Sequence, residues 1–479
     1  MINLKEYSSN GAFDEFISDQ SKFRTQASKI GNLLNSLTSS ELKDIHQATQ
    51  SAIKSMGISF RVYDKNNSFE DRSWPLDFIP RIIRNSEWDT VSKGLQQRCK
   101  AINLFIEDCY NDQEFLKSGL MDPNLILKSP SFKKECIGMK LPYSVWSHIS
   151  GTDLIRDKDG NFYVLEDNLR VPSGVSYMIE NRLVMKKVFP ELFNHYGVLP
   201  VDEYTSKLYS TLASLQSSKS KPEIVILTPG VFNSAYFEHS HLAQQLGIDL
   251  VQGSDLLVSE DGYVYKKTIN GLKKIDVIYR RINDDYLDPL VWNKNSTLGV
   301  QGIINAWKNK KVVIVNAPGC GIADDKAVYS YVPQMIKFYL NESPILKNID
   351  TFLCSDKNSR DYVINHMQDL VVKPVNESGG YGIVIGRDTT NKERLEVGKK
   401  INKNPRNYVA QPLVSLSTAP TYCSGELDAR HMDLRPFVLS GAKNYVSVGG
   451  LTRVALKKGA TVVNSSQGGG SKDTWVIDR

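Results

Sequence analysis

The sequence lacks the features that place a protein in a membrane or outside the cell. No apolar run approaches the ~18 residues of a membrane-spanning helix, and the opening stretch MINLKEYSSNG lacks the apolar core of a signal peptide. The six cysteines lie far apart and form no C-x-x-C pair, which argues against a zinc site and against a disulfide framework. These absences predict a reduced, cytoplasmic protein without a membrane partner.

The sequence also lacks a strong excess of charge. Its 59 basic and 53 acidic residues leave a net charge of +6, and the basic residues are scattered along the chain. We therefore expect no nucleic-acid partner. The positive balance leaves an RNA-linked protein as a remote alternative, whose signature would be salt-dependent retention on a phosphate polymer. Hydrophobic residues make up 41% of the 479 residues, which suits a globular protein of two to four lobes.

The pattern of apolar residues divides the chain into four segments. Residues 1–135 are mainly helical and are expected to pack outside the rest. Residues 136–213 switch to short strands and turns, and the polar stretch SLQSSKSKP that follows is a predicted linker. Residues 220–320 contain the strand–helix–strand unit EIVILTPG, SAYFEHSHLAQQLG and IDLVQG, which predicts a small α/β domain. Residues 321–479 alternate helix and strand and end in a meander of strands.

A hairpin is predicted within GTDLIRDKDGNFYVLEDN. The turn formers DKDGN lie between apolar residues, so the two flanking runs are expected to pair. Pairing across this turn places Ile155 opposite Val164 and Asp153 opposite Glu166. A register slip of one residue would remove both pairs.

This register gathers three oxygen donors on one face of the hairpin: Asp153, Glu166 and Asn168. Side chains alternate along a strand, so the second and third of these share a face. Two like charges opposite each other destabilise a sheet unless a cation lies between them. Mg²⁺ takes carboxylate and amide oxygens together with phosphate oxygens and water, which makes it the predicted cation. The alternative is a solvent-exposed hairpin end.

A Gly-rich loop lies in LVVKPVNESGGYGIVIG, where a strand leads into Gly379, Gly380 and Gly382 and a second strand follows. Glycines let backbone N–H groups approach phosphate oxygens, and Lys373 supplies a positive charge just before the loop. The loop is not a Walker motif, because no G-x-x-x-x-G-K-[ST] occurs, and an ordinary Gly-Gly hairpin is the alternative. Upstream, NAPGCGIADDKAVYSYVP places Lys326 after a Gly-rich turn at a predicted helix start.

Three further stretches carry candidate ligand contacts. NYVAQPLV is a predicted edge strand that ends at Gln411 and Pro412, where unpaired backbone groups would bind an adenine; an ordinary edge strand is the alternative. In MDLRPFVL, Asp433 and Arg435 share a face, and Arg453 follows Gly-Gly in GGLTRVAL. An arginine can stabilise a transferring phosphoryl group, although a surface ion pair is the more common role. The final NSSQGGGSKD is either a disordered tail or a loop that a ligand orders.

With these motifs the sequence resembles the circularly permuted ATP-grasp family of type 2, formerly a domain of unknown function. It is similar, more remotely, to the synthetase half of glutathionylspermidine synthetase. The resemblance covers most of the chain, from about residue 40 to 477, and rests on the strings HISGTDLIRD, YVLEDNLRVPSGVSYMIENR, LTPGVFNSAYFEH, VIYRRINDDYLDP, NAPGCGIADDKAVY, VVKPVNESGGYG, HMDLRPFVL and VNSSQGGGSKDTW. It implies an α/β protein with α+β lobes: a circularly permuted ATP-grasp fold, a small α/β pre-ATP-grasp domain and a helical N-terminal segment.

The order of the motifs carries the permutation. ATP-grasp enzymes usually place the two lysines first, then the glycine loop, the hinge and the arginines, and last the aspartate and the E-x-N pair that hold magnesium. Here Asp153, Glu166 and Asn168 come first. The resemblance thus implies that the metal hairpin has moved to the front of the chain and rejoins the same site in space.

The resemblance implies contacts to ATP, to magnesium and to a substrate. The residues that would contact ATP are Lys326, Lys373, Gly379, Gly380, Gly382, Gln411 and Leu413. The residues that would bind Mg²⁺ are Asp153, Glu166 and Asn168. The residues that would face the transferred phosphoryl group are Arg435 and Arg453. The residues that would contact the substrate are Arg170, Ser173 and Ser176.

The function implied is an ATP- and Mg²⁺-dependent carboxylate–amine ligase that acts through an acyl-phosphate. Its partners would be a small-molecule or peptide carboxylate and an amine acceptor. Catalysis would rest on positioning and charge stabilisation, with no nucleophilic cysteine or serine. The alternative is a catalytically silent ATP-binding scaffold or sensor that partners peptide-modifying enzymes.

Overall fold

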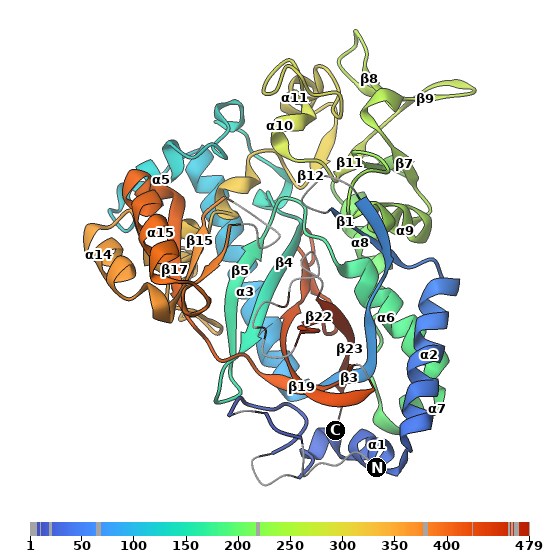
Figure 1. Ribbon diagram of the computed structural model, residues 1–479. Coiled ribbons are helices and arrows are strands. Elements are labelled where there is room, and N and C mark those ends of the chain that lie inside the picture. Colours follow the sequence, from blue (N-terminus) through green and yellow to red (C-terminus); the bar gives the residue numbers. More distant parts are fainter. Residues whose placement is uncertain are drawn as a thin grey trace.

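The computed structural model describes residues 7–9, 11–18, 22–63, 69–216, 221–376, 382–423, 425–457, 460, 463 and 469–478. Helices and strands gather around a central sheet, with smaller sheets on two sides of it (Figure 1). The helices are α1 (Ser28–Ser36), α2 (Ser39–Ser55), α3 (Asn85–Tyr110), α4 (Glu114–Lys117), α5 (Asn124–Leu127), α6 (Val175–Val188), α7 (Pro190–Tyr196), α8 (Glu203–Ala213), α9 (Tyr236–Leu246), α10 (Asp284–Leu287), α11 (Ile303–Lys308), α12 (Lys326–Tyr329), α13 (Val332–Leu340), α14 (Lys357–Asn365) and α15 (Asn391–Lys403).

The central sheet joins the front of the chain to its end. Within the described ranges its order is β13–β5–β4–β19–β22–β23–β3, with β18, β20 and β21 paired beside it. These strands are β3 (Leu76–Arg84), β4 (Ile149–Arg156), β5 (Phe162–Asn168), β13 (Lys347–Asn348), β18 (Thr418–Cys423), β19 (Glu426–Arg435), β20 (Phe437–Leu439), β21 (Tyr445–Val446), β22 (Leu451–Val454) and β23 (Gly470–Ile477). Because β4 pairs with both β19 and β20, the predicted hairpin is built into the C-terminal part of the fold.

The N-terminal segment contributes a strand to this sheet. The expectation that the segment packs outside is wrong for β3, which runs parallel to β23. Its first eight residues, LDFIPRII, are all buried. A near-continuous apolar run is typical of a strand that is covered on both faces. The remaining strands of the segment, β1 (Ser59–Tyr63) and β2 (Phe69–Ser73), form a separate two-stranded sheet.

The predicted strand–helix–strand unit is confirmed by β6 (Ile224–Leu227), α9 and β7 (Asp249–Val251). On the other side of β6 lie β11 (Val277–Arg280) and β12 (Val313–Val315), so the parallel sheet has the order β12–β11–β6–β7. The chain changes direction at β6, and in such sheets ligands bind beyond the carboxyl ends of the strands at that point. A three-stranded sheet of β8 (Leu256–Val258), β9 (Val264–Thr268) and β10 (Gly271–Lys274) projects from this domain (Figure 1).

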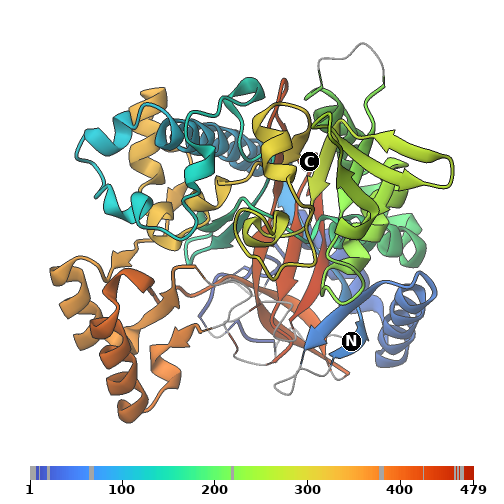
Figure 2. The same cartoon turned by 90° about the horizontal axis from the view of Figure 1, so that it is seen from above.

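A small antiparallel sheet with α14 and α15 forms a lobe on the opposite side of the central sheet (Figure 2). Its strands are β14 (Phe352–Leu353), β15 (Leu370–Pro374), β16 (Val384–Ile385) and β17 (Tyr408–Pro412). The pair β15–β16 confirms the predicted strand–loop–strand unit. The prediction of NYVAQPLV as an edge strand is wrong, because β17 lies between β14 and β15. The two residues of β14 are too few to give a strand signal in the sequence.

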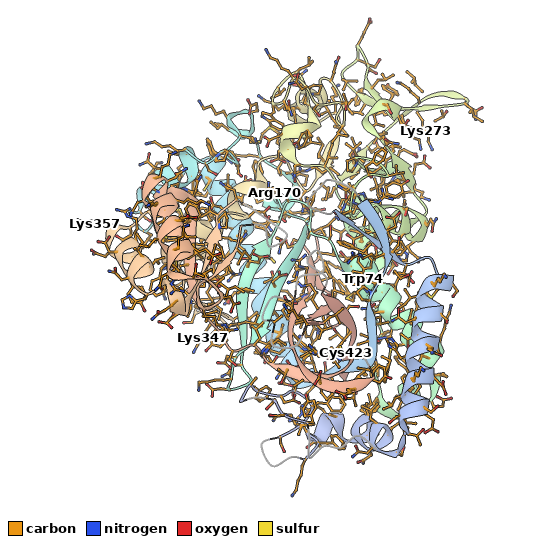
Figure 3. All side chains as sticks on the ribbon, in the orientation of Figure 1. Trp74, Arg170, Lys273, Lys347, Lys357 and Cys423 are labelled. Atoms are coloured by element: carbon orange, nitrogen blue, oxygen red, sulfur yellow. The ribbon has the colours of Figure 1, made fainter. Side chains whose placement is uncertain are left out.

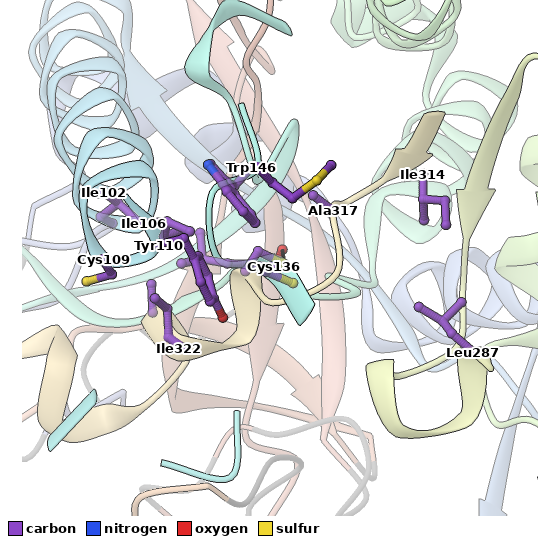
Figure 4. Packing of buried hydrophobic residues seen from close by; sticks show 14 of the residues in the cluster. Ile102, Ile106, Cys109, Tyr110, Cys136, Trp146, Leu287, Ile314, Ala317 and Ile322 are labelled. Atoms are coloured by element: carbon purple, nitrogen blue, oxygen red, sulfur yellow. Dashed lines mark hydrogen bonds between the residues drawn. The ribbon is translucent and has the colours of Figure 1, made fainter. Parts of the chain in front are cut away.

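An apolar core ties α3 to the small parallel sheet. Figure 4 shows its packing, in which Ile102 and Ile106 of α3 share a cluster with Ile314 of β12. The Tyr110 ring stacks on Trp146, with ring centroids 4.8 Å apart. Trp146 lies just before β4, so this core fixes the start of the strand that carries Asp153.

In the described ranges, no helix is both long and apolar enough to cross a membrane.

Candidate active site

The hairpin of β4 and β5 places Asp153 directly opposite Glu166. Asn168 lies opposite Gly151, so Asn168 and Glu166 share the face of Asp153. The predicted convergence of these three side chains on one face is therefore present in the structure. Asp167, between them, points to the other face and is held by Arg98 of α3 through two donors at 2.6–3.0 Å.

The register nearer the turn differs from the prediction. Leu154, and not Ile155, lies opposite Val164. The register shifts by one between Asp153 and Leu154, because β5 carries one additional residue, Leu165, as a β-bulge. The bulge leaves the predicted pairing intact at Asp153 while changing it towards the turn.

Asp153 holds two arginines. Arg435 donates to both of its carboxylate oxygens, at 2.5 and 2.8 Å, and Arg453 donates to one of them at 2.7 Å. Arg453 also binds Asp433, which lies directly opposite it on β19. Burial alone would raise the pKa of Asp153, but the two guanidinium groups outweigh burial and hold that pKa well below its usual range. The carboxylate is therefore ionised at neutral pH.

Glu166 faces the lysine at the start of α12. The Nζ of Lys326 lies 3.5 Å from Glu166, and the backbone N–H of Lys326 bonds to the carbonyl of Val375 at 3.2 Å. Asn168 has a buried Nδ2 without a hydrogen-bond partner in the described ranges. No group of three or more His, Cys, Asp or Glu side chains arranged for a metal occurs there. A magnesium site would therefore combine the amide of Asn168 with carboxylates.

Lys373 is buried on β15, near Asp153, Glu166 and Lys326. Its Nζ donates to Gln411 Oε1 at 2.6 Å. Burial lowers the pKa of Lys373 to about 8, Glu166 and Asp153 counteract this decrease, and Lys326 adds to it. Glu166, Asp153 and Lys326 thus lie near enough to Lys373 to shift its pKa, although the four side chains come from β4, β5, α12 and β15.

The structure describes only some of the remaining residues that were predicted to contact ATP. Gln411 is buried and also donates to Thr351 Oγ1 at 3.0 Å, and the backbone N–H of Leu413 bonds to the carbonyl of Asp369. Gly382 has a φ of +71°, which favours glycine. Gly379 and Gly380, as well as most of the final NSSQGGG stretch, lie outside the described residues.

The predicted substrate residues follow β5. Arg170, which Figure 3 shows near the middle of the molecule, is ion-paired with Asp324. The Ser173 carbonyl accepts a hydrogen bond from Arg435 at 3.2 Å, so this turn lies beside the arginine pair. Ser176 is fully buried, and its Oγ has no hydrogen-bond partner in the described ranges.

Two functional candidates were not singled out from the sequence: Glu238 and Arg281. Both are buried, and both bond to the turn between Pro172 and Ser176. The available signals were a charged residue in the apolar helix SAYFEHSHLAQQLG and an Arg-Arg pair after the buried strand VIY. Neither signal says which distant segment the side chain meets.

Comparison with known proteins shows the family to which the chain belongs. Residues 80–455 match the family model of the circularly permuted ATP-grasp type 2 proteins. The chain belongs to this family. The roles of Asp153, Glu166, Lys326 and Lys373 in such a site stay predictions.

Relatives cover nearly the whole chain. An uncharacterized protein of Synechocystis sp. is 48% identical over 478 residues, which are 99% of each chain. An uncharacterized protein of Mycobacterium tuberculosis is 46% identical over 97% of this chain and 84% of its own. A protein of Frankia casuarinae, named provisionally as a glutamate–cysteine ligase, is 37% identical over 99% of this chain but only 55% of its own length.

A solved structure shares the fold. The apo structure of a glutathione synthetase-like effector of Globodera pallida has a TM-score of 0.60 and covers 92% of this chain and 98% of its own. Its sequence identity of 12% limits the comparison to the fold. The family and the relative from Frankia casuarinae together indicate an ATP-dependent ligase.

Proposed function

We propose that the protein is an ATP- and Mg²⁺-dependent carboxylate–amine ligase that works through an acyl-phosphate. The observation that carries the proposal is the meeting of Lys326 and Lys373 with Asp153 and Glu166. Positive and negative groups from four separate elements gather there, and Lys326 and Glu166 form an ion pair at 3.5 Å. This arrangement suits a ligand that carries both phosphates and a divalent cation.

The charge of the cluster favours a polyanion. Its cations outnumber its carboxylates by one: Lys326, Lys373, Arg435 and Arg453 against Asp153, Glu166 and Asp433. A triphosphate brings excess negative charge, which the two lysines would contact as point charges. Gln411 and Leu413 at the end of β17 would meet the adenine. Gly379, Gly380 and Gly382 would form the loop over the phosphates.

Glu166 and Asn168 fit the role of magnesium ligands. Glu166 has Lys326 as a charged partner, 3.5 Å away, and the buried amide nitrogen of Asn168 has no hydrogen-bond partner among the described residues. The amide oxygen of Asn168 is the atom that would bind the metal. Both oxygens of Asp153 accept from arginines, Oδ1 one bond and Oδ2 two, so Oδ1 keeps a lone pair with which Asp153 could act as a third ligand. Bound magnesium would neutralise phosphate charge.

The reaction would proceed in two steps. An oxygen of the substrate carboxylate attacks the γ-phosphorus, the bond to the β–γ bridging oxygen breaks, and ADP leaves. The amine then attacks the acyl-phosphate carbon, the amine loses a proton and phosphate leaves with the bonding electrons. Arg435 and Arg453 would stabilise the charge on the transferred group, and a closed loop would exclude water from the acyl-phosphate.

The proposal is tested by ADP release with paired pools of carboxylic acids and amines. Glutamate with cysteine is the first pair to try, because a relative bears that name. We expect release that depends on both partners and on Mg²⁺, and that K373M abolishes. ATP binding without ADP release in any pool would instead favour the silent scaffold.

A further inference from the structure

The small α/β domain reaches across to the turn that precedes α6. Glu238 lies in the first turn of α9 and Arg281 directly follows β11. Their side chains form an ion pair at 2.8 Å and are 0% and 1% exposed. An ion pair this deeply buried is costly to form unless further hydrogen bonds satisfy both groups. One further bond goes from Arg281 to the Tyr279 hydroxyl, and the others lead to the turn between Pro172 and Ser176. Arg281 Nε has no partner among the described residues.

Glu238 binds the backbone of the turn. Its Oε2 accepts from the N–H groups of Gly174 and Ser176, at 2.6 and 3.2 Å. The first turn of a helix has N–H groups without intrahelical partners, and Gly174 has no side chain to cap them. The carboxylate from α9 therefore serves as the cap of α6.

Arg281 binds the other side of the same turn. Its guanidinium donates to the carbonyl of Pro172 at 2.8 Å, to the Tyr279 hydroxyl at 2.8 Å and to Ser173 Oγ at 2.5 Å. A guanidinium has donors only, so the Ser173 oxygen must accept in this bond. The Ser173 hydrogen remains available, and no described residue accepts it.

The turn also contacts the phosphoryl-site arginine. Arg435 donates to the Ser173 carbonyl at 3.2 Å while it holds Asp153 through two bonds. A continuous set of charge-assisted bonds therefore runs from Glu238 through Arg281 and Ser173 to Arg435. Ser173 is half-buried, so its hydroxyl sits at the border between this network and the open site.

We propose that Glu238 and Arg281 are positioning residues that fix Ser173 as a hydrogen-bond donor to the acid substrate and hold Arg435 in place. The inference rests on the proposed ligase function. It adds a requirement on the substrate: an acceptor oxygen, from a carboxylate or a carbonyl, must face Ser173 beside Arg435.

The test compares E238Q, R281K, S173A and S173T with E180Q. Glu180 is a buried glutamate between α6 and α9 that pairs with His241 and makes no bond to the turn, so E180Q controls for disturbance of this interface. With the acid–amine pair found by ADP release, we measure kcat and KM for the acid. Affinity for Mg²⁺ and the non-hydrolysable analogue AMP-PNP is measured without the acid.

We expect R281K and S173A each to lower kcat/KM for the acid about 10- to 100-fold, the range for one hydrogen bond to a charged group. S173T should retain most activity, and AMP-PNP affinity should stay within about twofold in all variants. R281K and S173A both disrupt the bond between the residue at 281 and Ser173 Oγ. The double variant should therefore have a kcat/KM for the acid only slightly below that of the less active single variant. Multiplying effects, or unchanged kcat/KM, would overturn the inference.

The inference is also tested on the protein alone, in case no acid–amine pair supports ADP release. Hydrogen exchange at the amides of residues 174 and 176 should speed up in E238Q and not in E180Q. Equal protection in wild type and E238Q would overturn the positioning role. Absence of ADP release in wild type would count against the ligase proposal only.

Discussion

Asp153 and Arg435 form a two-bond ion pair between residues 282 positions apart in the chain. The pair joins the hairpin of β4 and β5 to the last strands of the central sheet. In this permuted chain, the hairpin and the strands that carry Arg435 and Arg453 are thus held together by charge as well as by the backbone pairing of β4 with β19.

Removing the charge of Asp153 is expected to destabilise the fold. D153N removes the carboxylate partner of Arg435 and one of the two carboxylates that hold Arg453, and breaking a buried pair in this way costs about 3–5 kcal/mol. We expect a fall of this size in the free energy of unfolding, measured by denaturant titration, together with loss of ADP release. D159N is the matched control, because Asp159 is an exposed carboxylate in the same hairpin and pairs with exposed Lys158. A fully stable D153N would contradict the assignment.

The lowered pKa of Lys373 predicts proton uptake on nucleotide binding. Burial lowers this pKa to about 8, so the group is charged below that pH and increasingly neutral above it. Phosphate favours the charged form and would raise the pKa in the complex. Affinity for Mg²⁺–AMP-PNP should therefore fall as the pH rises from about 7 to 9. Calorimetry in buffers of different ionisation enthalpy should show proton uptake near pH 8.5.

K373R is the control for this titration. Its guanidinium stays protonated across this range, so proton uptake near pH 8.5 should disappear. If K373R takes up as many protons as wild type, another group is responsible.

The ion pair between Arg98 and Asp167 should stabilise the hairpin on the face opposite Glu166 and Asn168. It is 1% exposed on each side and fixes the residue between Glu166 and Asn168 to α3. R98M alone leaves a buried carboxylate and should lower the free energy of unfolding by about 3–5 kcal/mol. R98M combined with D167L should lose less than R98M alone, because no unpaired charge remains. Additive losses in this double-mutant cycle would show that the two side chains act separately.

The end of the glycine loop should reject a side chain. A Cβ on Gly382 would lie 2.8 Å from the Pro374 ring, and its φ of +71° strains any other residue. G382A should lower the free energy of unfolding by at least about 1–2 kcal/mol. In the same lobe, G398A lies within α15 with its nearest contact at 3.7 Å, and it should gain about 0.5–1 kcal/mol. Thermal unfolding of both variants tests the contrast.

The convergence of Asp153, Glu166 and Asn168 on one face could be predicted because strand alternation and the turn formers DKDGN act over a few residues. The helix start at Lys326 and the strands around the glycine loop follow from equally local patterns. The bulge at Leu165 could not be predicted, since an extra residue in a strand is accommodated by packing on both faces. The pairing of Asp153 with Glu166 was nevertheless predicted correctly, because the bulge changes the register only between itself and the turn.

The sequence by itself determined the chemistry of the site: which groups carry charge, which loops can approach phosphates and which strands alternate. Only the tertiary structure decided their partners. It placed β17 inside its sheet, committed Asp153 to two arginines, and brought Glu238 and Arg281 to the turn at Ser173. The physical reason is range: propensity and alternation act over a few residues, whereas these contacts depend on how distant elements pack and on which buried charges must find a counter-charge.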